Sequence, residues 1–159
     1  MSRFAENTSV PVEKSRAEIE KLVVRYGADQ FASGWDGERA LINFRMRGRY
    51  VRFILPLPDR KSREFTYTPR SHQPRSIDSA REAYDGAVRQ RWRALALVIK
   101  ARLEAVDSGI SSFEEEFLAN LVIPTADGPR TLGEWAIPEV ARAYESGAMA
   151  LLPFSGGSS

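Results

Sequence analysis

The sequence predicts an α+β fold: an N-terminal helix, a three-stranded antiparallel β-meander, a long basic loop, a long α-helix and then short C-terminal helices. Three observations predict it. Apolar side chains recur at helical spacing in residues 15–26 and again in residues 84–106, and between them residues 28–56 alternate in polarity around two tight-turn signals. At 159 residues the chain is expected to form one domain, with an ordered core over about 13–150 and flexible termini.

The first helix is expected to begin at Ser15. Glu18 follows three residues later, which is the spacing of a capping box. Residues 1–12 are polar and aperiodic, so we expect a flexible terminus there. One apolar stripe leads to Gly27, where the helix should end; it consists of Ile19, Leu22, Val23 and Tyr26.

The meander is predicted from the turns Asp36-Gly37 and Arg47-Gly48. With Arg47 and Gly48 as loop residues, Phe44 opposes Val51 and Ile42 opposes Phe53. The same rule at Asp36-Gly37 sets Phe31 against Ile42. One face, the predicted core face, then collects Phe31, Ile42, Phe44, Val51, Phe53 and Leu55, and the other collects Asn43, Arg45, Tyr50 and Arg52.

Residues 57–77 are predicted to form a mobile loop. A loop of about twenty residues is unusual in a compact domain and is commonly either a binding loop or a disordered one. The stretch from Pro56 to Ile77 holds four prolines and five basic residues, and a short strand at 63–68 is an option within it.

A long helix should follow, capped by Asp78 or Ser79 and ending before Gly109. Its buried seam is expected to comprise Tyr84, Val88, Trp92, Leu95, Ile99, Leu103 and Val106.

The C-terminal part is predicted to contain two short helices, one opened by Ser112 with Glu115 and one opened by Pro138 and ending at Ser146. These helices are candidates to cover the apolar back of the long helix at Leu97 and Val98. Residues 151–159 read as a tail, with Phe154 a candidate for docking.

Charge is unevenly distributed along the chain. Residues 45–102 carry fifteen basic and five acidic side chains, a net +10, whereas residues 103–159 carry two basic and nine acidic ones, a net −7. Such a division favours either a polyanionic partner for the middle of the chain or neutralisation of the middle by the acidic end. The second arrangement predicts a homo-oligomer when the two parts belong to different copies.

The candidate nucleic-acid contacts follow from this basic middle. On the outer sheet face, arginines beside an exposed aromatic can neutralise phosphates and stack on bases. The long helix adds a basic stripe and the loop adds further cations. The full candidate set is Asn43, Arg45, Tyr50, Arg52, Arg60, Lys61, Arg63, Arg89, Arg93 and Lys100. The alternative is a merely solvated or self-paired surface.

Catalytic and metal sites are not indicated. The chain has no cysteine, and its single histidine, His72, lies between prolines, so neither a metal cluster nor a histidine-based triad can be assembled. We therefore expect no cofactor, no metal and no enzymatic activity. No apolar run approaches the ~20 residues of a membrane span, and the absence of cysteine favours the cytoplasm. Trp35 and Trp135 are expected either in the core or as anchors for a partner.

Three segments resemble small hypothetical proteins carried by bacteriophages and prophages: Gly34 to Pro58, Arg89 to Leu95 and Phe113 to Leu118. No activity is known for that family, so the resemblance implies a setting in phage replication, recombination or interference with the host. The helix, meander, helix order is also that of the double-stranded-RNA-binding domain, whose lysine cluster is missing here. Phage single-strand annealing proteins likewise combine a meander with a long helix.

Two functions are therefore expected. The first is a non-enzymatic phage-type accessory protein that binds single-stranded or exposed DNA or RNA through the basic sheet face, the loop and the helix stripe. The second is a protein-binding modulator of a host or phage machine, acting through Trp35, Trp135 or the apolar flank of the long helix.

Overall fold

A computed structural model describes residues 3–147 of the chain, with side chains from Val12 onward. It confirms the α+β class. The predicted tail at 151–159 and the docking of Phe154 lie outside the described residues. The elements are α1 (Arg3–Arg25), β1 (Gln30–Asp36), β2 (Arg39–Met46), β3 (Arg49–Pro56), α2 (Arg63–Thr66), α3 (Ile77–Asp107), α4 (Phe113–Phe117), η1 (Leu118–Asn120), β4 (Val122–Thr125), β5 (Gly128–Thr131) and α5 (Leu132–Glu145).

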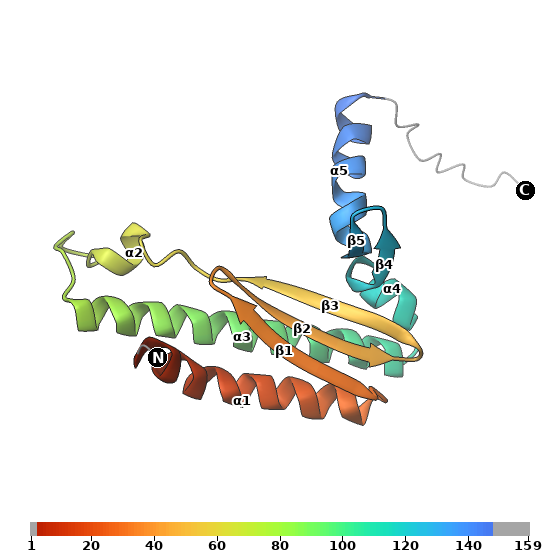
Figure 1. The fold of residues 1–159 in the computed structure, drawn as a ribbon, viewed down its shortest axis with the longest axis horizontal. Helices are drawn as coiled ribbons and strands as arrows, with labels where there is room; N and C mark the ends of the chain where they lie inside the picture. The colour runs from red at the N-terminus through yellow and green to blue at the C-terminus, as the bar shows by residue number, and fades with distance from the viewer. Residues whose placement is uncertain (1–2, 148–159) are drawn as a thin grey trace, which may run out of the picture.

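The molecule has two layers and a projecting arm (Figure 1). Helices α1 and α3 lie side by side beneath one face of the sheet, whose strand order is β1-β2-β3. The segment β4–β5–α5, which we call the arm, rises from the end where α3 finishes and leaves the other sheet face largely open. Both helices therefore cover the core face, and the outer face points away from them.

The core joins the sheet to the two helices. From β2, Ile42 and Phe44 are each 1% exposed, and from β3, Val51 is 0% exposed. The predicted seam of α3 is confirmed from Tyr84 to Leu103, and Val106 is partly buried beside it. The apolar pattern of the sequence thus locates the core correctly, because burial of apolar area is the main driving force for folding.

The register of the second hairpin is confirmed, with Phe44 opposite Val51 and Ile42 opposite Phe53. Its loop residues Arg47 and Gly48 both have positive φ, 53° and 73°, as a type I′ turn requires. Arginine is unusual in this conformation, and its guanidinium lies 5.6 Å from the centre of the Phe113 ring.

The register of the first hairpin differs from the prediction by two residues. Phe31 opposes Phe44 instead of Ile42, because the strands pair up to Asp36 and Arg39 and the loop falls on Gly37 and Glu38. An ion pair between Asp36 and Arg39, 3.1 Å long, closes the last rung. A shift of two residues preserves the side-chain faces, so Phe31 still faces the core.

The predicted start of α1 was wrong. The helix begins at Arg3, in the stretch expected to be a flexible terminus, and Ser15 lies inside it. A serine followed by a glutamate three residues later is equally compatible with a helix interior. The ion pair between Glu13 and Arg16, 2.8 Å long, spans the predicted boundary at the spacing of one helical turn.

The segment 57–77 contains the short helix α2 instead of a strand. Phe65 of α2 is 4% exposed and packs edge-on against Tyr84 of α3, with ring centres 5.5 Å apart. Beyond α2, an isolated bridge pairs Tyr67 with Pro74. These contacts attach the predicted mobile loop to the beginning of α3.

The caps of the later helices are partly as predicted. The capping box of Ser112 and Glu115 is confirmed at α4. The N-cap of α3 is Ser76, whose Oγ accepts a hydrogen bond from the Ser79 amide, so the predicted caps Asp78 and Ser79 lie within the helix.

Helix α5 begins at Leu132 rather than at Pro138, which lies inside it. Thr131 and Glu134 form its capping box, and this reciprocal pair satisfies two free amides at the helix start. The hairpin of β4 and β5 that precedes α5 was not predicted.

The C-terminal part completes the core at the edge of the sheet. Leu121 forms an antiparallel bridge with Val51, which extends the sheet beyond β3. Phe117 is fully buried, and its ring meets those of Phe44 and Phe53 edge-on at 6.2 Å. The short helices thus close the end of the core. The described C-terminal helices do not cover Leu97 and Val98 as predicted, since these side chains are 62% and 42% exposed.

Candidate nucleic-acid interface

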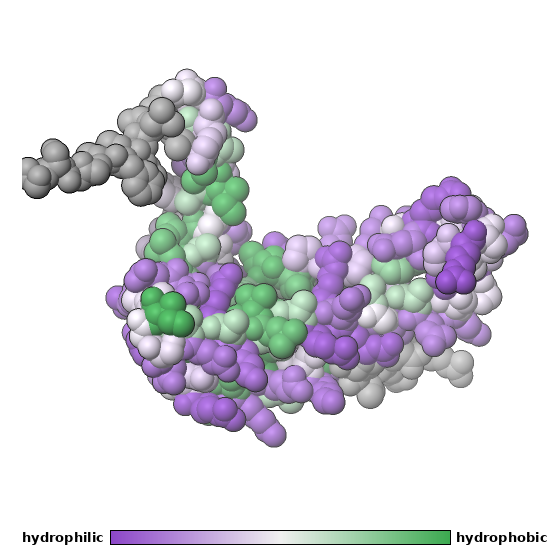
Figure 2. Space-filling model, turned by 180° about the vertical axis from the view of Figure 1, so that it is seen from behind, coloured by the Kyte–Doolittle hydropathy of each residue, from purple (hydrophilic) through white to green (hydrophobic). Residues whose placement is uncertain are grey.

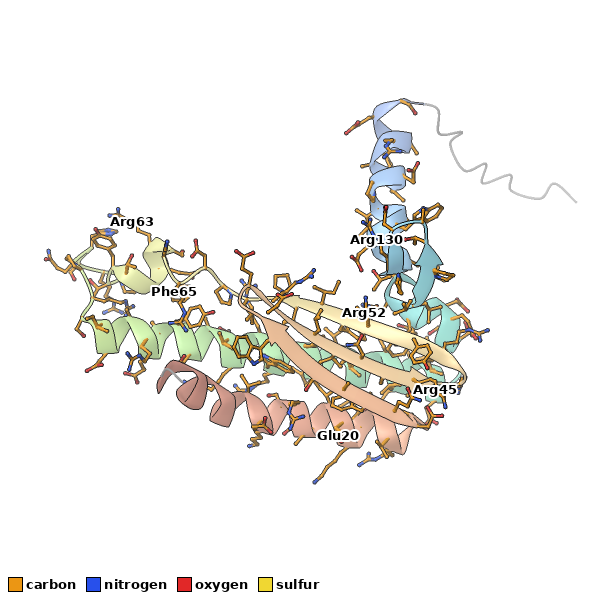
Figure 3. The ribbon with its side chains drawn as sticks, viewed as in Figure 1. Glu20, Arg45, Arg52, Arg63, Phe65 and Arg130 are labelled. Atoms are coloured by element: carbon orange, nitrogen blue, oxygen red, sulfur yellow. The ribbon has the colours of Figure 1, made fainter. Side chains whose placement is uncertain are left out.

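The outer sheet face gathers the four predicted side chains. Arg45 lies directly opposite Tyr50 and Asn43 directly opposite Arg52, on neighbouring strands β2 and β3. Tyr50 is 52% exposed, and the other three are partly buried. The prediction that Arg45 and Arg52 emerge together on the side away from the helices is therefore confirmed (Figure 3).

Arg45 is already engaged by a carboxylate. Its Nε donates to Asp29 Oδ1 at 2.8 Å, and its Nη2 donates to the second carboxylate oxygen. This two-bonded ion pair lowers the pKa of Asp29 and raises the pKa of Arg45, mainly through the side-chain hydrogen bonds. A phosphate would have to displace Asp29 to use the full charge of Arg45.

Arg52 is likewise held within the protein. Its Nε donates to Asn43 Oδ1 at 2.8 Å, and its carbonyl accepts from Asn120 Nδ2 at 3.1 Å. Hydrogen bonds from Thr131 are the main reason that the pKa of Glu134 is lowered, and Arg52 lies close enough to contribute. The outer face therefore presents a hydrogen-bonded network more than a set of free cations.

Arg63 lies at the far end of the molecule from Arg45, and Arg60 and Lys61 precede it by three and two residues (Figure 3). Arg60 stacks over the Tyr84 ring at 4.1 Å, and burial lowers its pKa. Arg63 lies over the Tyr67 ring at 4.4 Å, and Lys61 is exposed beside them. These cation–π contacts hold both arginines against aromatic rings of the protein itself.

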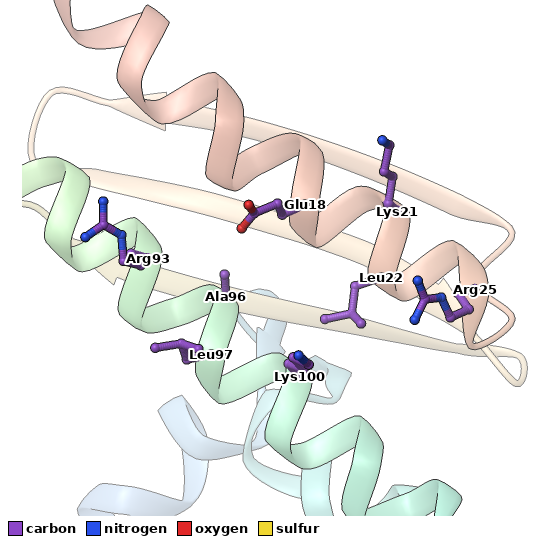
Figure 4. A pocket seen from close by; sticks show the side chains of 8 residues that line it. All are labelled: Glu18, Lys21, Leu22, Arg25, Arg93, Ala96, Leu97 and Lys100. Carbon is purple, nitrogen blue, oxygen red and sulfur yellow. The ribbon is translucent and has the colours of Figure 1, made fainter.

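The helix stripe lies on the opposite side of the molecule from the sheet face. Arg93 and Lys100 line a groove of about 400 Å³ between α1 and α3, with the sheet behind the two helices (Figure 4). Arg89, one turn earlier, is exposed but is not among the residues lining the groove. The ten predicted residues therefore belong to three separate surfaces.

Two further cations complete the groove. Lys21 and Arg25 of α1 line it with Arg93 and Lys100, and we call these four residues the cationic groove. The other lining residues are Glu18, Leu22, Ala96 and Leu97. Four cations and one carboxylate give the groove a net charge of +3.

None of the four groove cations forms an ion pair with another side chain described, from Val12 to Gly147, and all are exposed. Charge of one sign in a hollow raises the local concentration of the opposite ion. Guanidinium and ammonium groups are the side chains that bind phosphate oxygens, and Leu22 and Leu97 add an apolar lining that suits a sugar or a base edge.

Lys21 and Arg25 were missed from the sequence. They stand four residues apart on α1, so they share one face of that helix, and this spacing is visible in the sequence. The sequence does not predict that this face borders α3 beside Arg93 and Lys100. That juxtaposition depends on how the two helices pack.

The remaining predicted features lie outside the groove. Trp35 is 72% exposed and Trp135 is 54% exposed, so neither belongs to the core. Among the side chains that the structure describes, acidic and histidine residues form no group of three that could hold a metal ion. No helix within residues 3–147 is long and apolar enough to cross a membrane.

Comparisons of the chain with protein-family models, with curated proteins and with solved structures give no match.

Proposed function

We propose that this protein is a non-enzymatic accessory protein that binds nucleic acid through the cationic groove. One observation carries the proposal: the fold brings Lys21 and Arg25 of α1 beside Arg93 and Lys100 of α3, with no acidic partner among the described residues. In the outer sheet face, by contrast, Asp29 already neutralises Arg45.

The proposed ligand is a single strand or an exposed segment of DNA or RNA. A phosphate backbone offers charges along a line, and four cations on two parallel flanks match such a line better than they match a single small anion. In keeping with the resemblance to small phage proteins, we place this binding in the cytoplasm of an infected host, during replication, recombination or interference with the host.

The test is titration of a labelled single-stranded oligonucleotide at two salt concentrations. With four phosphate contacts, log affinity should fall against log salt with a slope of about −3. Absence of binding at low salt would reject nucleic-acid binding altogether.

Matched variants locate the site. The groove variant replaces Lys21, Arg25, Arg93 and Lys100 by glutamine, and the control variant replaces Lys61, Arg70, Arg130 and Arg142, which are exposed cations elsewhere. Both lose the same charge. We expect the groove variant to lose affinity at least about tenfold more than the control. Equal losses would mean a diffuse charge effect and no groove site.

A third variant, Arg45→Gln with Arg52→Gln, tests the outer sheet face. Because Arg45 is paired with Asp29, we expect its affinity to change less than that of the groove variant. A larger loss from this variant would move the site to the sheet.

Binding of another protein is a second candidate function, favoured by the exposure of Trp35 and Trp135. Large aromatic side chains left in water are frequent anchors of protein interfaces. The expected result is capture of a host or phage protein from nuclease-treated infected extract by the wild type, and loss of that capture on Trp35→Ala or Trp135→Ala. Capture that persists in both variants would exclude the tryptophans as anchors.

A further inference from the structure

Helix α5 presents an apolar face to solvent. The face consists of Ala136, Ile137, Val140, Ala143 and Tyr144, which cover about 120° of the helix at 100° per residue. Ile137, Val140 and Tyr144 are 67%, 53% and 69% exposed. The helix contacts η1 and β5 near its start, and its remainder projects from the body (Figure 1). We call this surface the arm face.

Helix α3 carries a second exposed apolar surface on its back. Leu97 and Val98 lie there between the small residues Ala94 and Ala101, all on the side of α3 away from the buried seam. In Figure 2, which views the molecule from behind, apolar side chains gather over the middle of the body and on the arm. We call Ala94, Leu97, Val98 and Ala101 the back stripe.

The two surfaces match in length and shape. The back stripe runs over eight residues, Ala94 to Ala101, and the arm face over nine, Ala136 to Tyr144, so each covers about 10–12 Å of helix. The alanines at both ends of the back stripe leave room for a close helix approach, and the larger side chains of the arm face can fill it.

The two surfaces are also complementary in charge. Arg93 and Lys100 border the back stripe on one side. Arg91 and Arg102 stand on the other side, where their guanidinium groups donate to the Pro56 carbonyl and to Asn120 Oδ1. The arm face is bordered by Glu139 on one side, where it pairs with Arg142 at 2.6 Å, and by Glu134 and Glu145 on the other. Glu134 is held by Thr131 in the capping box, so Glu145 is the border carboxylate that can meet Arg93 and Lys100 of a second copy. Two apolar stripes with opposite charges along their edges are the arrangement by which helices select a partner.

The arm of the same chain is directed away from its own back stripe. Gly133 lies so close to η1 that an added Cβ would be 2.9 Å from the Ala119 carbonyl oxygen. This contact, with the capping box at Thr131, fixes the direction in which α5 leaves the body. The charges and lengths therefore favour a second copy as the occupant.

We propose that α5 of one copy docks its arm face on the back stripe of a second copy, and that the exchange is reciprocal. A reciprocal exchange uses both contacts, closes the assembly as a twofold dimer and leaves no surface for further growth. Burial of apolar side chains drives the association, and the flanking charges fix its register. The proposal does not depend on nucleic-acid binding. Because Leu97, Arg93 and Lys100 also line the groove, a docked arm and a bound strand would exclude each other on one copy.

The test is sedimentation equilibrium of the full chain, freed of nucleic acid by nuclease because Arg93 and Lys100 also line the groove. Wild type should pass from a monomer of 17.8 kDa to a dimer of twice that mass between about 1 and about 100 µM. Leu97→Asp and Val140→Asp should each raise the dimer dissociation constant at least about tenfold. Ile110→Asp, at an 81% exposed apolar residue outside both surfaces, should dimerise as wild type does.

Mixing the two defective variants gives the decisive measurement. Leu97→Asp keeps an intact arm face and Val140→Asp keeps an intact back stripe, so the mixture can rebuild one of the two contacts. We expect more dimer in the mixture than in either variant alone. A monomeric wild type, variants that associate as wild type does, or a mixture without recovery would each overturn the proposal. Unfolding in urea confirms that both variants fold, as expected for exposed positions.

Discussion

Arg45 Nε lies 2.8 Å from Asp29 Oδ1, and a second hydrogen bond joins the same two side chains. The backbone prepares this contact, since the Asp29 amide donates to the Arg45 carbonyl just before β1 begins. The most prominent cation of the predicted interface is therefore committed to a neighbour that lies sixteen positions away in the sequence.

This ion pair makes the free energy of unfolding depend on pH. Because the pKa of Asp29 is lower in the folded protein than its ordinary 3.8, the pair stabilises the fold above that value, and the stabilisation is lost as pH falls through the lowered pKa. Urea unfolding at about pH 7 and about pH 3 should show that wild type exceeds Asp29→Asn in stability mainly at the higher pH. By carboxyl NMR, Arg45→Gln should return the Asp29 pKa toward 3.8. An unchanged pKa in that variant would contradict this account.

Gly133→Ala should destabilise the protein. The new methyl group would meet the Ala119 carbonyl oxygen at 2.9 Å, and overpacking of this kind costs about 1–3 kcal/mol. Gly86→Ala in α3 is the matched control, because its nearest neighbour is the flexible end of Arg89 at 3.6 Å. That change should stabilise by about 0.5–1 kcal/mol, since alanine is the better helix former. Urea unfolding measures both, and a neutral Gly133→Ala would mean that η1 and α5 can separate.

Phe117→Ala should cost about 3–5 kcal/mol of unfolding free energy, because it leaves a cavity among the rings of Phe44, Phe53 and Phe113. Leu118→Ala, at the next residue and 50% exposed, should change stability by less than about 1 kcal/mol. Similar small losses in both variants would show that the C-terminal segment is not part of the core.

Asn120→Ala should cost about 1–3 kcal/mol, because it leaves partly buried hydrogen-bonding groups without partners. Asn120 accepts from Arg102 Nη1 at 2.8 Å and donates to the Arg52 carbonyl at 3.1 Å, so it connects α3 with β3. Arg39→Gln breaks only an exposed ion pair with Asp36 and should change stability by less than about 1 kcal/mol. Thermal unfolding of the two variants distinguishes them; equal shifts would contradict a structural role for Asn120.

Side-chain periodicity was sufficient to locate most of the core. The alternation through Ile42 and Phe44 fixed which sheet face is buried, and the three- and four-residue steps from Tyr84 to Leu103 fixed the buried side of α3. Helix boundaries were less predictable. Ser15 and Pro138 carry signals that are typical of helix starts, yet each lies within a helix because the residues before it continue the same hydrogen-bonding pattern.

The amino-acid sequence by itself determined the α+β class, the second-hairpin register and the concentration of positive charge in the middle of the chain, because these follow from local spacing and composition. Only the tertiary structure decided which cations meet. In the folded protein, Arg45 pairs with Asp29, and Arg63 lies at the end of the molecule far from both. Lys21 and Arg25 lie beside Arg93 and Lys100. The physical reason is that a periodic pattern fixes the side of an element on which a residue stands, whereas the neighbour across that side depends on how whole elements pack.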